Sequence, residues 1–148
     1  MSIQASPKQP PSATVQTGSS RHPSSHNLPL LRHQLIIPIN SQKWSGGAYT
    51  SNTLVPRTSF KTTHGSPKSY TVIGESGGKN VHWFCGDCGS SLYTELDLMP
   101  DATIVKSGTI DDKAVREGKI GIEFYTKDRV PYSGAVEGAE QKRVFLDS

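Results

Sequence analysis

The chain has 148 residues, of which 33% are apolar, and this size allows one modest domain. Its apolar stretches are about five residues long, as in Leu35–Ile39, far below the roughly 20 residues that span a bilayer, so we expect no membrane protein. Residues 1–74 carry seven Lys/Arg and no Asp/Glu, whereas residues 75–148 carry nine Lys/Arg and all 13 acids. The basic residues of the first half stand singly along the chain, which argues against a nucleic-acid partner.

The N-terminal 40 residues differ in composition from the rest of the chain. They hold six of the ten prolines and no acidic residue, and Met1–Asn27 shows no hydrophobic periodicity. Such a segment buries too little surface to offset the entropy of ordering it, so we predict a disordered tail. Leu28–Ile39 is more apolar but is bracketed by prolines, and it either docks as an edge strand or stays exposed. We therefore divide the chain into a separate segment over 1–40 and a β domain over 41–148.

The remaining pattern favours a mainly β, sandwich-like fold. Short runs of β-formers are separated by turns rich in Gly, Pro, Asn and Asp. A short helix is expected over Asp111–Glu117, where Asp111 can cap the first turn and Gly118 can end the last. The predicted strands, in chain order, are Ala48–Val55, Ser59–Thr63, Ser69–Ile73, Asn80–Phe84, Ser91–Glu95, Ala102–Lys106 and Gly121–Thr126.

The two cysteines of the chain, Cys85 and Cys88, stand three residues apart between two predicted strands. Two thiolates at this spacing can bind one zinc ion. Gly86 and Gly89 follow the cysteines and allow positive φ, which aims backbone N–H groups at the sulfurs. A redox dithiol and a plain turn with two free thiols are the alternatives. A redox pair would prefer a helix after the first cysteine, which the glycines disfavour.

Further zinc ligands for this pair are hard to find in the sequence. A structural zinc site usually has four ligands, and the chain offers only these two cysteines. His82 precedes Cys85 by three residues, but we interpret it as a strand side chain, and His64 as a loop residue. The other histidines, His22, His26 and His33, fall in the predicted tail. Two cysteines in all indicate a reducing setting, so we expect a cytoplasmic or nuclear protein.

A series of short motifs along the β domain resembles one known family. They occur in a fixed order between about Gln42 and Thr126, and they resemble the glutathione-dependent formaldehyde-activating enzymes, a family that also includes centromere protein V. The motifs are Trp44-Ser45-Gly46, Asn52-Thr53-Leu54-Val55-Pro56, Phe60, Gly65-Ser66-Pro67-Lys68-Ser69-Tyr70, Phe84-Cys85-Gly86-Asp87-Cys88-Gly89-Ser90 with Leu92-Tyr93, and Gly108-Thr109-Ile110-Asp111-Asp112.

The resemblance implies a compact β fold of the Mss4-like type with two zinc ions. Cys85 and Cys88 match the later half of the structural zinc site. A second, catalytic zinc is held in the family by a Cys-x-Cys-x-x-Cys motif just before the Trp-Ser-Gly segment. The implied activity is that of a carbon–sulfur lyase that joins formaldehyde to the thiol of glutathione. Glutathione is accordingly the implied small-molecule partner, and zinc the implied cofactor.

This chain departs from the family pattern on the N-terminal side of Gln42. The three catalytic cysteines would fall at Ile36, Pro38 and Ser41, and the early Cys-x-Cys would fall around Val15 and Thr17, where no residue is cysteine. We therefore expect zinc-dependent activity to be impaired. One alternative is a non-catalytic interaction module, which can pair two Cys85/Cys88 turns across a homodimer. Another is the product of an altered gene, in which a different N-terminal segment replaces that of the family.

Overall fold

A computed structural model of the chain describes residues 32–62, 67–110 and 117–145. The predicted disorder of Met1–Asn27 and nearly all of the predicted helix Asp111–Glu117 lie outside these residues. The fold is mainly β, as expected from the sequence, with one short α-helix, α1 (Ile39–Ser45), among the described residues. The strands are β1 (Arg32–Ile36), β2 (Thr50–Pro56), β3 (Lys68–Ile73), β4 (Lys79–Phe84), β5 (Ser91–Leu96), β6 (Ala102–Lys106), β7 (Ile120–Phe124) and β8 (Glu140–Lys142).

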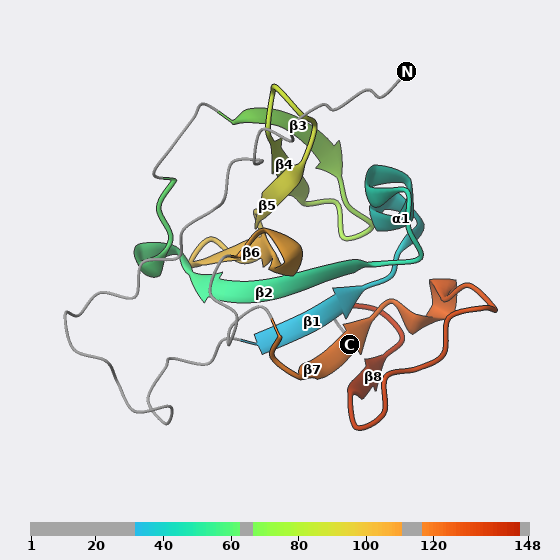
Figure 1. The fold of residues 1–148 in the computed structure, drawn as a ribbon. Coiled ribbons are helices and arrows are strands. Elements are labelled where there is room, and N and C mark those ends of the chain that lie inside the picture. The colour runs from blue at the N-terminus through green and yellow to red at the C-terminus, as the bar shows by residue number, and fades with distance from the viewer. Residues whose placement is uncertain (1–31, 63–66, 111–116, 146–148) are drawn as a thin grey trace, which may run out of the picture.

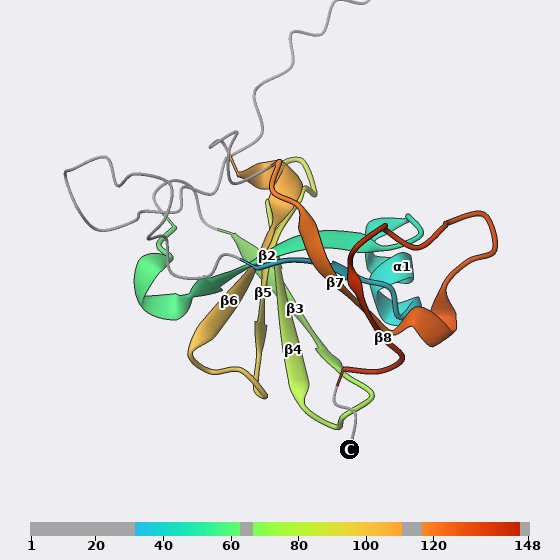
Figure 2. The same ribbon diagram turned by 90° about the horizontal axis from the view of Figure 1, so that it is seen from below.

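The described strands form one mixed sheet in the order β3-β4-β5-β6-β2-β1-β7-β8. Its twist is strong. In Figure 1, β2, β1 and β7 cross the lower part of the molecule while β3, β4 and β5 run steeply above them. Figure 2 shows β6, β5, β4 and β3 spreading as a fan away from β2. No helix of the described ranges is long and apolar enough to cross a bilayer.

Strand β1 lies inside the sheet, so the expectation of an edge strand or an exposed segment is wrong. It pairs antiparallel with β2 and parallel with β7. His33, which the sequence analysis assigned to the tail, is 6% exposed, and its Nδ1 lies 3.3 Å from Thr53 Oγ1. Burial lowers the pKa of His33. The domain boundary at residue 41 stays a prediction, but the sheet already includes Arg32–Ile36.

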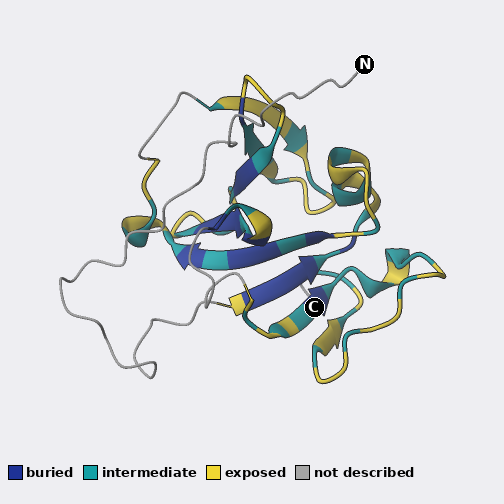
Figure 3. Ribbon diagram, in the orientation of Figure 1, coloured by how far each residue is buried: buried dark blue, intermediate teal, exposed yellow. Residues whose placement is uncertain are grey.

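One face of the sheet carries the hydrophobic core. Val55 and Val105 are fully buried at its centre, and Phe60 and Trp83 pack against the cluster from its margin. Figure 3 shows the buried residues concentrated in the middle strands. The buried members of the cluster are Val55, Leu92, Tyr93, Val105 and Ile110.

Two local elements differ from the sequence predictions. The predicted strand Ser59–Thr63 is replaced by a 3₁₀-helix over Arg57–Ser59, and Phe60 then makes only a single bridge. Helix α1 was not predicted. It has no side-chain cap at its N-terminus, and it ends at Gly46, whose φ of 68° closes the last turn through an N–H bond to Gln42. Its position depends on tertiary contacts more than on its own sequence.

The C-terminal strand β8 is attached through a buried carboxylate. Glu123 on β7 is fully buried and accepts a 2.8 Å hydrogen bond from Arg129 Nη1 and a 2.9 Å bond from the Val136 N–H. Gln141 on β8 donates to the same carboxylate. Burial raises the pKa of Glu123, but these hydrogen bonds outweigh it and leave the pKa below its ordinary value. The buried negative charge of Glu123 is therefore balanced by Arg129.

Candidate functional site

The strand register gathers polar side chains on the sheet face opposite the hydrophobic core. Asn52 on β2 pairs with Lys106 on β6. Ile104, two residues before Lys106 on the same strand, pairs with Thr94 on β5. Thr94 in turn pairs with His82 on β4. Because side chains alternate along a strand with a period of two, paired residues and their second neighbours share one face. Four strands thus contribute polar groups to the same surface.

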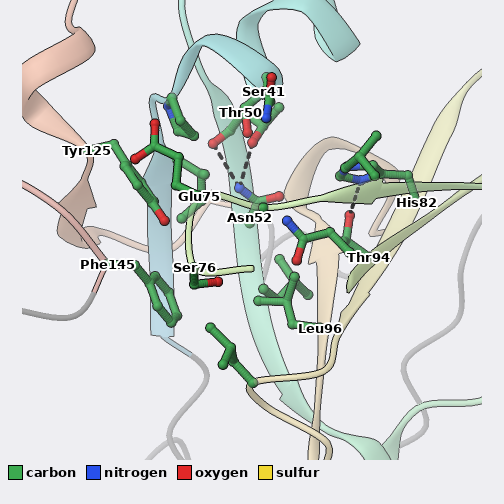
Figure 4. Close-up of a pocket in the computed structure, with 18 of the residues that line it drawn as sticks. Ser41, Thr50, Asn52, Glu75, Ser76, His82, Thr94, Leu96, Tyr125 and Phe145 are labelled. Carbon is green, nitrogen blue, oxygen red and sulfur yellow. Dashed lines mark hydrogen bonds between the residues drawn. The ribbon is translucent and has the colours of Figure 1, made fainter. Parts of the chain in front are cut away.

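A cavity of about 90 Å³ opens on this face beside α1. Several waters or one small organic group fit such a volume, whereas drug-sized ligands need about 300 Å³ or more. Figure 4 shows Asn52 and Thr50 at its centre, His82 and Thr94 on one side, and Tyr125, Glu75 and Phe145 on the other. The lining residues that the arguments below use are Ile36, Pro38, Ser41, Asn52, His82 and Lys106.

Lys106 is the cation at the centre of this site. Its Nζ donates a 2.8 Å hydrogen bond to Asn52 Oδ1, while Asn52 Nδ2 donates to the Thr50 carbonyl and hydroxyl at 2.9 Å. The amide of Asn52 is therefore fixed in the orientation that offers its oxygen to the lysine. Burial lowers the pKa of Lys106 to about 8, because a desolvated ammonium loses hydration that one amide oxygen only partly replaces.

His82 stands next to this lysine in a second polar pair. Its Nδ1 lies 2.9 Å from Thr94 Oγ1, and its ring stacks on Trp44 with the centroids 4.8 Å apart. Burial, assisted by the positive charge of Lys106, lowers the pKa of His82 to about 4. The imidazole is therefore neutral at neutral pH. The sequence prediction that His82 is a strand side chain holds, and its position on the cavity wall is a feature of the tertiary structure.

Trp44 holds α1 against the sheet and so shapes the cavity wall. Besides His82 it contacts Tyr70, with centroids 6.4 Å apart, and Phe84 at 5.8 Å. Its indole Nε1 donates a 2.7 Å hydrogen bond to Ser91 Oγ. On the opposite side of the helix, Gln42 Nε2 donates to the carbonyls of Ile37 and Asp128. These contacts from one short helix place Ser41 at the cavity.

The cysteine pair lies outside this cavity, in the predicted turn between β4 and β5. Cys85 is buried and Cys88 is exposed. The Asp87 N–H donates to Cys85 Sγ at 3.4 Å, and Gly89 has the expected positive φ of 75°. Gly86 does not have a positive φ, contrary to the prediction. A Cβ there would lie 3.0 Å from the end of the exposed Lys68 side chain, which can move away, so nothing in the structure requires a glycine at this position.

The two thiols contact each other in this turn. Hydrogen bonds from the Ser90 hydroxyl, the Ser90 N–H and the Cys85 side chain lower the pKa of Cys88. The cysteines could thus supply two zinc ligands. No cluster of three His, Cys, Asp or Glu that could hold a metal ion occurs within 32–62, 67–110 and 117–145. The metal role of Cys85 and Cys88 stays a prediction.

The comparison with known families decides the relationship of this chain. A family model described as glutathione-dependent formaldehyde-activating enzyme matches residues 38–128. The chain belongs to this family. No curated protein matches it significantly. The match confirms the resemblance derived from the motifs and extends it four residues upstream of Gln42, to Pro38. The family description names glutathione and formaldehyde as the reactants of this family.

The donor set of the cavity does not fit the catalytic zinc that the family resemblance implies. Ile36, Pro38 and Ser41, the positions expected for its three cysteines, do line the cavity together. Two of them carry hydrocarbon side chains, and the third offers a hydroxyl, which is a weak zinc ligand beside thiolate or imidazole. The three positions at which the resemblance implies cysteines therefore share one cavity wall, and none of them supplies a thiolate.

Sequence reasoning missed Asn52 and Lys106. A signal was present, since Lys106 shares a strand face with the apolar Ile104, and Asn52 occupies the middle of a predicted strand. A lysine or an asparagine in the centre of a sheet violates the usual hydrophobic pattern, and such violations cluster at functional sites.

Proposed function

We propose that this protein binds a small thiol adduct of the glutathione class in the cavity beside α1, and that it does not catalyse zinc-dependent condensation of formaldehyde with glutathione. The observation that supports this is the presence of Ile36, Pro38 and Ser41 together on the cavity wall. These three residues offer no thiolate to a zinc ion, and this supports binding without zinc-dependent catalysis.

The size of the cavity limits how such a ligand would lie. About 90 Å³ admits the thiol end of glutathione with a one-carbon group attached, but not the whole tripeptide. The peptide portion would extend over the outer surface of α1, which has no buried residue. Free thiols in the protein suit a reducing, cytoplasmic compartment, where glutathione is the principal small thiol.

Binding is tested by titrating the full chain with glutathione and with its hydroxymethyl adduct, followed by NMR chemical shifts. A matched pair of variants distinguishes the cavity from the rest of the helix. Ser41→Phe fills the cavity wall, whereas Lys43→Phe adds the same ring at an exposed position of α1. Loss of binding in S41F alone supports the proposal. Equal binding by both variants, or no binding by the unmodified protein, contradicts it.

Catalysis is tested separately in metal-replete protein. After incubation with zinc and removal of the free ion, we expect about zero zinc ions per chain. We also expect formaldehyde and glutathione to condense at the spontaneous rate in the presence of this protein. A zinc content near two per chain, or a rate clearly above background, contradicts the proposal, because either would require ligands that the cavity wall does not supply.

A second candidate function rests on the cysteine turn. Cys85 and Cys88 provide two thiolates of a four-thiolate site on one turn, in which Cys88 is exposed and Cys85 is buried, so two copies of the chain could complete the site and form an interaction module. Zinc near one half per chain, together with a dimer that EDTA dissociates, favours this function. A metal-free monomer rules it out.

A further inference from the structure

Lys106 occupies an unusual position for a lysine. Strand β6 lies between β5 and β2 in the interior of the sheet, and the side chain reaches the cavity on the polar face. Its hydrogen-bond acceptor is the neutral amide oxygen of Asn52 at 2.8 Å. Each ion pair found within the described ranges joins other residues. The amine is thus held in a defined place without a carboxylate to keep it protonated.

The other titratable groups of the cavity supply no negative charge that would keep the Lys106 amine protonated. His82 on β4 is neutral at pH 7. Glu75, from the turn between β3 and β4, lies at the rim with half of its side chain exposed and forms an ion pair with Lys127. Burial first, and then the nearby Glu75 charge, raise the pKa of Tyr125, so its phenol is neutral as well. Burial lowers the pKa of Lys106 to about 8, so about one amine in ten is uncharged at pH 7.

We propose that Lys106 is a nucleophile that captures small aldehydes at this cavity. The uncharged Nζ attacks the carbonyl carbon, a C–N bond forms, and the π electron pair moves to the oxygen. The oxygen gains a proton from solvent and the nitrogen releases one, which gives a carbinolamine. The carbinolamine then loses its hydroxyl group and the remaining N–H proton together as one water molecule, which leaves an imine, and addition of water reverses this step. No oxidant, reductant or metal ion takes part in this sequence.

Geometry supports the amine in this role. An uncharged amine donates one N–H to Asn52 Oδ1 and keeps its lone pair, so the hydrogen bond positions the nitrogen without blocking attack. The cavity of about 90 Å³ admits an aldehyde of one or a few carbons. Formaldehyde is the aldehyde that the family name specifies. This chemistry goes beyond the proposed thiol binding and needs neither glutathione nor zinc.

The test is reductive trapping with limiting formaldehyde and cyanoborohydride at pH 7, without any thiol. Methylation of each lysine is then measured by peptide mass spectrometry. Lys43 and Lys79 are exposed and serve as internal references. We expect Lys106 to be methylated about tenfold faster than either reference, because its larger uncharged fraction outweighs its lower basicity. The preference should disappear in urea-unfolded protein.

A pH series and one variant complete the test. The rate at Lys106 should level off above about pH 8, because burial lowers the pKa of its amine to about 8. Asn52→Asp places a carboxylate beside the amine and should reduce trapping at Lys106 to the reference rate. If N52D does not fold, the pH series of the unmodified protein decides. Methylation of Lys106 at or below the reference rate refutes the inference, whatever the result of the glutathione titration.

Discussion

Replacement of Trp44 by alanine should loosen the wall of the cavity. The indole ring contacts Tyr70, His82 and Phe84, and its N–H donates to Ser91 Oγ at 2.7 Å. Aromatic contacts of this kind contribute about 0.5–1.5 kcal/mol each beyond the buried area, and a hydrogen bond contributes about 1 kcal/mol. Because Trp44 is only half buried, we take the lower part of these ranges and expect a loss of about 3 kcal/mol in unfolding free energy.

The assay is urea unfolding followed by far-ultraviolet circular dichroism, with Trp44→Phe as the matched control. Phenylalanine keeps most ring contacts and loses the hydrogen bond to Ser91, so W44F should lower the free energy of unfolding by about 1 kcal/mol. For a chain of about this length, 3 kcal/mol corresponds to a fall in Tm of about 6–12 °C. Glutathione binding should weaken in W44A more than in W44F, because α1 carries Ser41 to the cavity.

A loss below about 1 kcal/mol in W44A would refute this account of α1. It would mean that Gln42, which bonds to the carbonyls of Ile37 and Asp128, holds the helix without help from the aromatic contacts. A loss in W44F equal to that in W44A would show instead that the indole N–H, and not the ring stacking, provides the stabilisation.

Three further predictions follow from the same structure. Glu123→Gln should lower the free energy of unfolding by about 3 kcal/mol, because it leaves Arg129 without its buried charge partner. The control E140Q, on the exposed surface, should lower it by less than about 0.5 kcal/mol in the same urea titration. Folding lowers the pKa of His82 to about 4, so the unfolded chain takes up a proton at this residue before the folded protein does. The free energy of unfolding should therefore be highest above about pH 6.5 and fall as the pH drops toward 4, and the urea midpoint of H82Q should vary less over that range. Replacement of Ile36, Pro38 and Ser41 by cysteine should create a zinc site in the cavity, which is measured by the charge-transfer absorbance of bound Co²⁺. Absorbance no stronger than in the unmodified protein would show that the three positions do not lie within ligand distance of one another.

Much of the fold could be predicted from local sequence. Alternating β-formers between turn residues located β2, β3, β4, β5 and β6 to within about two residues at each end, because strand propensity and turn chemistry are local properties. The turn that carries Cys85 and Cys88 was found for the same reason. The absence of cysteine at Ile36, Pro38 and Ser41 was also visible without a structure, since it required only the order of the motifs.

Other features depended on contacts that no local pattern encodes. Strand β1 contains the buried polar residues His33 and Gln34, so its hydrophobic alternation is hidden, and its place between β2 and β7 is set by pairing with strands far along the chain. Helix α1 lacks a capping side chain and owes its position to Trp44 and Gln42.

The sequence by itself determined the β class of this protein and its family. Only the tertiary structure brought Lys106 to Asn52 across 54 residues of chain and placed His82 beside them. The physical reason is that the pairing register of separate strands decides which side chains share a face, and burial on that face then shifts their pKa values. The desolvation of Lys106 beside a small cavity gives this residue its chemical significance.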